Sequence, residues 1–255
     1  MRIARLIQIY IVRSFLQWFA WRAFLITLVI NQMAGPLLGL AVWSAALPDA
    51  PAISSYYLAL FVVQLLTVSY ENHTLSHGIY DGSFSHDLLK PQPPIIPVLG
   101  DNLASRCWHV LLGIPVLAVI WIVVHPAFEP RLLALAIPAA LLAAALRFLF
   151  TYILALSAFW TQQADSAVGF AGVMIALLGG SAIPLSLFPD RMQDVITILP
   201  FQAMLGFPAN IAAGMNNSSQ IAGGYAVQVV WLCVSIGIAA IVWRRGIRRY
   251  AATGG

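Results

Sequence analysis

Apolar residues run along this chain in six long stretches, separated by shorter polar segments. The stretches are apolar on every face, show no two-residue alternation, and are about as long as the roughly 20 residues that a helix needs to cross a bilayer. Transmembrane strands would instead alternate over about ten residues. The six expected spans cover residues 23–47, 55–75, 107–125, 131–159, 166–188 and 222–243. The pattern predicts an all-α polytopic membrane protein, with residues 1–255 forming a single transmembrane domain.

The first segment, residues 1–22, has a different pattern, because its apolar side chains recur every three or four positions among arginines. This spacing predicts an amphipathic helix that lies in the membrane surface. A cleaved signal peptide is the alternative, but it needs an uninterrupted apolar region after its charges, and Arg13 and Arg22 interrupt that region. We therefore expect an N-terminal interfacial helix.

Two connections are long enough to carry function, residues 76–106 and residues 189–224. The second contains short apolar pieces interrupted by Pro200, Gly206 and Pro208. These pieces are too short to cross a bilayer, and irregular backbone is tolerated at membrane depth only where protein or water covers it. We expect residues 189–224 to form re-entrant helices that dip into the membrane from the outer side.

Composition and charge narrow the class of protein further. Hydrophobic residues make up 61% of the chain and charged residues only 9%, which excludes a water-soluble globular protein. Six spans place both termini on one side, and ten basic residues flank that side: Arg2, Arg5, Arg13, Arg22, Lys90, Arg106, Arg244, Arg245, Arg248 and Arg249. Only Arg131 and Arg191 flank the other side. Because basic flanks stay in the cytoplasm, we expect both termini to be cytoplasmic and interpret the basic excess as an orientation signal, not as nucleic-acid binding.

One absent motif restricts how the protein obtains energy. A Walker A loop holds phosphates with backbone amides and with the lysine of a Gly-Lys-Ser/Thr turn. Lys90 is the only lysine of the chain, and it follows Leu89. Work driven by ATP must therefore come from another subunit. The two cysteines, Cys107 and Cys233, offer neither a disulfide framework nor a zinc cluster.

His73 and His77 lie four residues apart and would share one helix face, with acidic residues nearby. Such a cluster can hold a metal ion. The alternative is a span that becomes polar where it leaves the membrane, and the chain has no His-Glu-x-x-His pattern. We expect no metal site and no catalytic residue.

Four polar residues are candidates for an intramembrane site. Glu71 and Arg147 are ionisable and lie within expected spans, where charges usually face a partner, the bundle interior or a water-filled path. Arg147 either reaches the inner headgroups, contacts Glu71 or another polar group, or lines a water-filled path. Asn31 and Gln32, near Pro36, form a polar notch in the first span. They either face the path or bond to a neighbouring helix.

The order and spacing of several motifs resemble one family. Residues 82–91 read Gly-Ser-Phe-Ser-His-Asp-Leu-Leu-Lys-Pro after the second span, and Gly179-Gly180 and Phe188-Pro189 mark the end of the fifth. Nearly the whole chain resembles the six-helix permease subunits of type-2 ABC exporters, although Lys90 stands where arginine is commoner. The resemblance implies a second permease, identical or homologous, and two cytoplasmic ATPase subunits that bind ATP and Mg²⁺. No cofactor is expected in this chain.

The resemblance also implies a coupling helix in the connection of residues 76–106, which we assign to residues 83–91. Ser83 suits the helix start, and Pro91 suits its end. Tyr80, Phe84 and Leu88 would form one apolar stripe, which either docks on an ATPase subunit or packs on this protein's own helix ends. The expected coupling residues are Tyr80, Ser83, Phe84, Asp87, Leu88, Leu89 and Lys90.

The function that follows from the resemblance is ATP-driven export of a small or lipid-like molecule across the inner membrane of a bacterium. Its partners would be the ATPase subunits, the second permease and membrane lipids. An ion-coupled secondary transporter is one alternative, and it would need carboxylates near the bilayer midplane and an inverted repeat. An intramembrane enzyme is the other, and it would need a nucleophile with a base or a metal triad.

Overall fold

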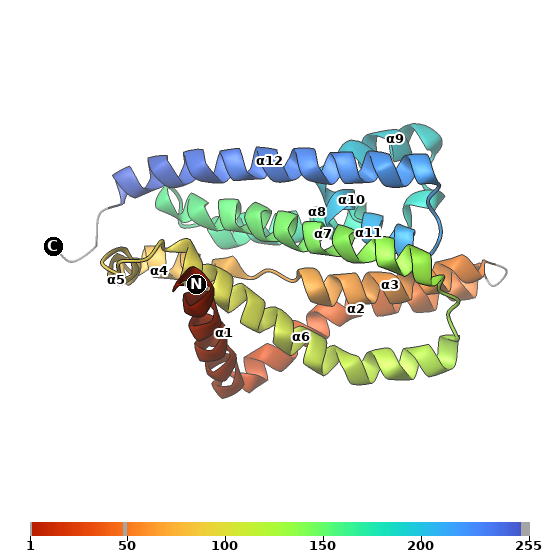
Figure 1. The fold of residues 1–255 in the computed structure, drawn as a ribbon, viewed down its shortest axis with the longest axis horizontal. Coiled ribbons are helices and arrows are strands. Elements are labelled where there is room, and N and C mark those ends of the chain that lie inside the picture. The colour runs from red at the N-terminus through yellow and green to blue at the C-terminus, as the bar shows by residue number, and fades with distance from the viewer. Residues whose placement is uncertain (1, 48–49, 251–255) are drawn as a thin grey trace.

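The computed structural model describes residues 2–47 and 50–250 as a bundle of helices, with no strand in these residues (Figure 1). The α-helices are α1 (Arg2–Ala20), α2 (Arg22–Ala46), α3 (Pro51–Thr67), α4 (Leu75–Tyr80), α5 (Phe84–Leu88), α6 (Ile95–Val124), α7 (Pro130–Leu156), α8 (Ala164–Leu178), α9 (Asp190–Ile198), α10 (Pro200–Met204), α11 (Gly206–Ala212) and α12 (Ser218–Arg249). The prediction of an all-α chain is confirmed for the described residues.

Four helices of the described chain, α2, α6, α7 and α12, are long and apolar enough to cross a membrane. The helices α3 and α8 are apolar but have only 17 and 15 residues, so they extend about 25 and 22 Å at 1.5 Å per residue. The six apolar runs of the sequence thus correspond to four long helices and two shorter ones.

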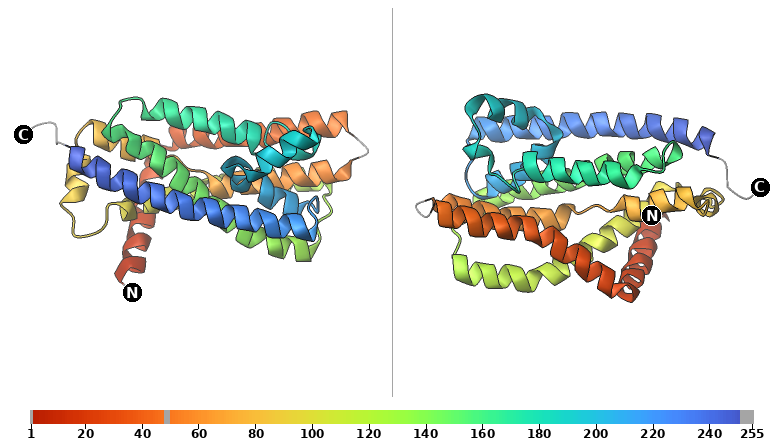
Figure 2. Two further views of the ribbon diagram at one scale, coloured as in Figure 1. Left: turned by 90° about the horizontal axis from the view of Figure 1, so that it is seen from above. Right: turned by 180° about the vertical axis from the view of Figure 1, so that it is seen from behind.

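The six apolar helices lie along the long axis of the molecule, and α1 crosses this axis (Figures 1 and 2). The short helices α4 and α5 and the last turns of α12 lie at one end, which we call the α5 end. The helices α9, α10 and α11 lie at the other, which we call the α9 end. The two long connections therefore lie at opposite ends of the bundle.

Helix α1 packs against the first half of α6 through aromatic contacts. Phe15 stacks on Trp108 with ring centroids 4.3 Å apart, and the Trp108 indole N–H donates to the Phe15 carbonyl over 3.0 Å. The Trp18 indole N–H donates to the Asp101 carboxylate over 3.1 Å. The opposite face of α1 exposes apolar side chains such as Leu16. This two-sided pattern is typical of a helix in a membrane surface.

The end of α3 and the start of α6 differ from the expected spans. The sequence pattern predicts a second span to residue 75, but α3 ends at Thr67 because side chains of α6 take the backbone groups that follow. Asn102 Nδ2 donates to the Val68 carbonyl over 3.3 Å, and Arg106 Nε donates to the same carbonyl over 3.0 Å. Helix α6 begins at Ile95, directly after Pro93 and Pro94. The third span was expected from residue 107, so the helix starts twelve residues earlier.

Helices α10 and α11 are enclosed by the bundle at the α9 end. Every residue of α11 is buried, and α11 lies against α3 and α7. The Gln228 amide of α12 donates to the Ala139 carbonyl of α7 and to the Ala203 carbonyl of α10, both over 2.9 Å. Helix α8 ends before Gly180, whose φ of 90° favours glycine and whose carbonyl accepts from the Tyr56 hydroxyl over 2.9 Å.

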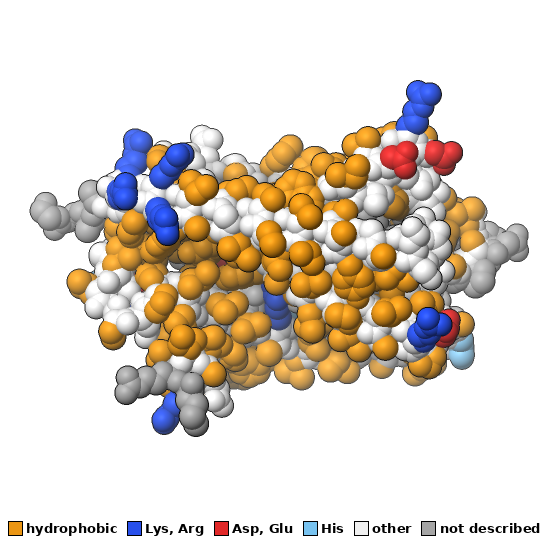
Figure 3. Space-filling view, turned by 45° about the horizontal axis from the view of Figure 1, so that its top comes forward, with side chains coloured by type: hydrophobic (Ala, Val, Ile, Leu, Met, Phe, Trp, Pro, Cys, Tyr) orange, Lys and Arg blue, Asp and Glu red, His pale blue; other side chains and the backbone are white. Residues whose placement is uncertain are grey.

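Charged side chains are distributed unequally between the two ends. Figure 3 shows lysine and arginine side chains gathered at the end that holds the last turns of α12, and basic and acidic side chains together at the opposite end. Helix α12 carries four arginines in its last six residues, Arg244, Arg245, Arg248 and Arg249. The α5 end is therefore the more basic one.

Candidate functional site

The α4–α5 segment, Leu75 to Lys90, contains all of the expected coupling residues. Its chain reverses at Gly82, where φ is 78°, so that α5 folds back toward the ends of other helices. The Tyr250 hydroxyl, just after α12, donates to the Gly82 carbonyl over 3.0 Å. This bond ties the turn to the end of α12.

Phe84 is buried, with only 3% of its side chain exposed. Its ring lies 6.1 Å from the Phe159 ring, 6.0 Å from the Trp243 ring and 5.8 Å from the Tyr250 ring, in edge-to-face arrangements. Of the two alternatives for the apolar stripe, the structure shows Phe84 packed on this protein's own helix ends, because the reversal at Gly82 turns it toward them. Phe84 anchors α5 to the ends of α7 and α12.

The other two residues of the expected stripe also contact this chain. The Tyr80 hydroxyl accepts a hydrogen bond from the backbone N–H of Ala164 over 2.9 Å, which ties α4 to the start of α8. Leu88 is partly buried and packs against the same apolar cluster as Phe84. The α4–α5 segment is therefore held against α7, α8 and α12 of this chain.

Ser83, Asp87, Leu89 and Lys90 face outward or bond locally. Leu89 is 84% exposed, and the Lys90 ammonium lies 2.6 Å from the Asp87 carboxylate beside it. Ser83 occupies the position before α5, but its hydroxyl does not cap the helix. Its backbone N–H instead donates to Asp81 over 2.9 Å, and the hydrogen bonds from Ser83 hold the pKa of the Asp81 carboxyl below its ordinary value.

Glu71 lies at the centre of a buried polar cluster between α3, α6 and α7, and only 2% of it is exposed. One of its carboxylate oxygens accepts from Asn102 Nδ2 over 2.6 Å, and the other accepts from the Thr151 hydroxyl over 2.5 Å. Asn102 also donates to the Ser69 hydroxyl over 3.0 Å. The cluster replaces the helix hydrogen bonds that the chain loses after α3.

Arg147 is 6% exposed and donates through Nη1 to the Thr67 hydroxyl over 3.1 Å. Within the described residues, no carboxylate lies within 4.0 Å of its guanidinium, and its Nε has no partner. Arg147 therefore neither reaches the surface nor forms a direct ion pair with Glu71. Of the expected alternatives, the structure shows a polar contact in the bundle interior.

Arg106 is the member of this region that sequence reasoning missed, because we assigned it to the connection of residues 76–106. It lies inside α6, donating through Nε to the Val68 carbonyl over 3.0 Å and through Nη2 to the Ala144 carbonyl over 2.8 Å. Asn102 and Thr151 were missed as well. The available signal was spacing, since Asn102 precedes Arg106 by four residues and Arg147 precedes Thr151 by four, which places each pair on one helix face.

Asn31 and Gln32 do not join the Glu71 cluster. The Gln32 side-chain oxygen accepts from Gln64 Nε2 over 2.7 Å, which joins α2 to α3. Asn31 is exposed on α2. His77 lies 3.8 Å from Asp165, and the described residues hold no group of three or more His, Cys, Asp or Glu side chains that suits a metal ion.

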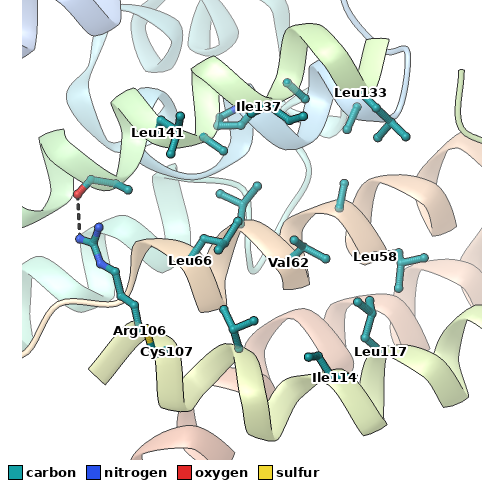
Figure 4. Close-up of a pocket in the computed structure, with 18 of the residues that line it drawn as sticks. Leu58, Val62, Leu66, Arg106, Cys107, Ile114, Leu117, Leu133, Ile137 and Leu141 are labelled. Atoms are coloured by element: carbon teal, nitrogen blue, oxygen red, sulfur yellow. Dashed lines mark hydrogen bonds between the residues drawn. The ribbon is translucent and has the colours of Figure 1, made fainter. Parts of the chain in front are cut away.

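An apolar groove of about 880 Å³ lies between α3, α6 and α7 (Figure 4). Three rows of side chains line it: Leu58, Val62 and Leu66 of α3, Cys107, Ile114 and Leu117 of α6, and Leu133, Ile137 and Leu141 of α7. Arg106 stands at one end of these rows, where its bond to the Ala144 carbonyl is drawn as a dashed line. Among the described residues, it is the one charged side chain of the lining.

Comparison with known protein families decides the class of protein. A family model described as ABC-2 family transporter protein matches residues 16–254. The chain belongs to the ABC-2 family of transporter proteins. No curated protein and no solved structure matches it. Membership confirms the resemblance to type-2 ABC permeases and makes this ABC-2 protein a membrane component of a transporter, in a family that associates with ABC ATPase components.

Proposed function

We propose that this ABC-2 protein is the permease subunit of an ATP-driven exporter that moves a small or lipid-like molecule out across the inner membrane of a bacterium. Family membership is the observation that carries the proposal. The chain has no Walker A lysine, so the ATP and Mg²⁺ would be bound by a separate ATPase. The α4–α5 segment supports the proposal, because it is tied to three of the bundle helices.

In this proposal six helices cross the membrane, α2, α3, α6, α7, α8 and α12. The four long helices meet the length of roughly 30 Å that a bilayer core requires. The shorter α3 and α8 cross with help from the non-helical residues beyond their ends. The Glu71 cluster satisfies the backbone after α3, as irregular structure at membrane depth requires.

The α5 end is the cytoplasmic side in this proposal, and both termini lie there. The four arginines at the end of α12 and the arginines of α1 support this orientation through the positive-inside rule. The α9 end is then the outer side, where α10 and α11 enter and leave from the same face. Their burial against α3 and α7 suits a plug at the exit of the transport path.

A second permease would pack on the face that α2 and α8 share (Figure 2). Both helices carry exposed large apolar side chains, Phe170 and Val173 on α8 and Ile30 and Leu38 on α2. A Cβ atom added at Gly172 would meet no atom of this chain, so α8 presents a small residue with open space beside it. Small residues let helix backbones approach closely within a membrane.

Coupling would pass from the ATPase to Leu89 and the Asp87–Lys90 pair, and from there through the anchored Phe84 into the bundle. Leu89 suits contact with a partner because it is the most exposed large apolar side chain among the described residues. This assignment moves the docking contact from Phe84 to the residues after α5.

A substitution at Leu89 tests the proposed function. The permease and its ATPase would be purified together in lipid vesicles, and ATP hydrolysis and transport would be measured for Leu89→Asp with Leu89→Met as the matched control. We expect the aspartate variant to lose the ATPase or its coupled hydrolysis, since a buried unpaired charge is costly, while the methionine variant keeps both. Full coupled hydrolysis in Leu89→Asp would contradict the docking assignment. A purified complex that contains no ATPase would contradict the function itself.

A further inference from the structure

The groove between α3, α6 and α7 is open along its length and is not filled by this chain. Its wall includes Ile114, Ile137 and Leu141, whose side chains are 53%, 61% and 67% exposed. Arg106 and Trp121 both line it and stand fifteen residues apart on α6, so the groove extends about 22 Å along that helix. One leaflet of a bilayer core is about 15 Å thick, so the groove is long enough for an acyl chain.

Arg106 gives this groove a charge that the described residues do not balance by contact. Its Nε and Nη2 donate to neutral oxygens of Val68, Ala144 and Ser69. No carboxylate of the described chain lies within 4.0 Å of the Arg106 guanidinium. Its Nη1 makes no hydrogen bond to the described residues and is not among their buried atoms, so it is open to a ligand. Phosphate oxygens are acceptors that suit a guanidinium, so a bound anion would supply the acceptor that Arg106 lacks at this end of the groove.

The charges around Arg106 leave a positive excess. The polar cluster behind the groove holds two arginines, Arg106 and Arg147, against one carboxylate, Glu71. Asp101, one turn earlier on α6, is turned toward α1, where it accepts from the Trp18 indole. The excess therefore favours an anionic ligand over a neutral or cationic one.

Along the long axis of the bundle, Arg106 lies at the level of α1. On α6 it stands between Asp101 and Trp108, and both of these side chains bond to α1. Ile11 of α1 lines the same groove. If α1 lies in the membrane surface, as its exposed apolar face favours, then Arg106 is at the boundary between headgroups and acyl chains.

We infer that this groove binds one anionic phospholipid of the inner leaflet. Its phosphate accepts hydrogen bonds from Arg106, and one acyl chain lies along the apolar rows of α6 and α7. The inference rests on the proposed membrane placement but not on ATP coupling. The lipid site and ATP-driven export can therefore be disproved separately.

Photo-crosslinking tests the site. The full permease would be placed in lipid nanodiscs with phosphatidylglycerol that carries a photoreactive diazirine on its acyl chain, and the adducts would be mapped by peptide mass spectrometry. We expect adducts on α3, α6 and α7 along the groove in excess over lipid-facing α12. Arg106→Gln should lower the groove adducts about tenfold, and Arg106→Lys should keep most of them. The same diazirine on phosphatidylcholine should label the groove no more than it labels α12.

A second pair of variants leaves Arg106 unchanged. Ile137→Trp narrows the groove at an exposed position, and Val230→Trp is its matched control on α12, since the two side chains are 61% and 59% exposed. We expect only Ile137→Trp to remove the groove adducts. Equal labelling by the two lipids, or groove adducts that survive both Arg106→Gln and Ile137→Trp, would overturn the inference. The inference would also be overturned if a second permease covered the groove and kept the lipid from labelling it.

Discussion

The Thr151 hydroxyl donates to the Glu71 carboxylate, with 2.5 Å between the two oxygens, in a region where neither residue is more than 4% exposed. The bond joins the C-terminal part of the long helix α7 to the segment after α3. Both partners lie among apolar helices, where buried polar groups need hydrogen bonds. The Thr151 hydroxyl also lies 2.9 Å from the Arg147 carbonyl of its own helix, and Glu71 also accepts from Asn102.

Replacing Thr151 with valine removes this donor while keeping the shape of the side chain. We expect Thr151→Val to lower the free energy of unfolding by about 1–3 kcal/mol, because one buried carboxylate oxygen of Glu71 loses its partner. Thr151→Ser keeps the hydroxyl and should cost much less. Thermal unfolding of the purified protein in detergent measures both, and equal midpoints for the valine and serine variants would contradict the role of this bond.

Removing the Glu71 carboxylate should affect the protein more strongly. Glu71→Ala removes the acceptor of Asn102 and Thr151 and the one acidic group that the described residues place beside Arg106 and Arg147, and we expect a loss of about 2–6 kcal/mol, at about 1–3 kcal/mol for each orphaned donor. Adding Arg147→Leu removes one of the two uncompensated charges, so the double variant should be more stable than the sum of the single effects predicts. Unfolding midpoints of the two single variants and the double variant decide this. Simple additivity would show that the two groups act independently.

The hydrophobic pattern predicted much of this fold, because six apolar runs leave few alternatives to a helical membrane bundle. The ends of the spans were harder to predict. The chain leaves the helix after Thr67 because Asn102 and Arg106, more than thirty residues away in sequence, bond to Val68 and Ser69. Hydropathy contains no information about such distant partners, and it therefore extended the helix of the second expected span beyond Thr67.

The candidate site shows the same limit. Periodicity placed Tyr80, Phe84 and Leu88 on one apolar face, but periodicity does not say whether a face packs on its own chain or on a partner. The turn at Gly82 decided in favour of this chain's helix ends. Arg106 was missed because the positive-inside rule counts charges near span ends by their position in sequence, and the structure places Arg106 eleven residues inside α6.

Phe84 and Leu89 should respond differently to truncation, although the sequence predicted both as coupling residues. Phe84→Ala removes a buried ring from an aromatic cluster, and we expect it to cost about 3–5 kcal/mol of stability. Leu89→Ala changes an exposed side chain and should stay within about 0.5 kcal/mol. Unfolding of the permease without its ATPase separates the two effects. If Phe84→Ala leaves the free energy of unfolding unchanged, Phe84 does not anchor α5, and it would again be a candidate for the surface that docks on the ATPase.

Two glycines of α12 provide a matched test of how tightly this helix packs at the α5 end. A Cβ atom added at Gly246 would lie 2.2 Å from the Phe159 ring, so either α12 or the ring must shift. A Cβ atom added at Gly237 on the same helix would meet nothing within 4 Å. Both glycines are helical, so each alanine substitution gains about 0.5–1 kcal/mol in helix propensity.

We expect Gly237→Ala to be neutral or stabilising for the isolated permease and Gly246→Ala to cost about 1–3 kcal/mol, because overpacking against Phe159 outweighs the gain in propensity. Phe159 also lies against Phe84, so Gly246→Ala should loosen α5 as well. Unfolding midpoints measure the first effect, and faster amide hydrogen exchange across α5 measures the second. Equal stability of the two alanine variants would show that α12 does not pack on Phe159. Normal exchange in α5 alongside a destabilised α12 would show that Phe159 does not link the two helices.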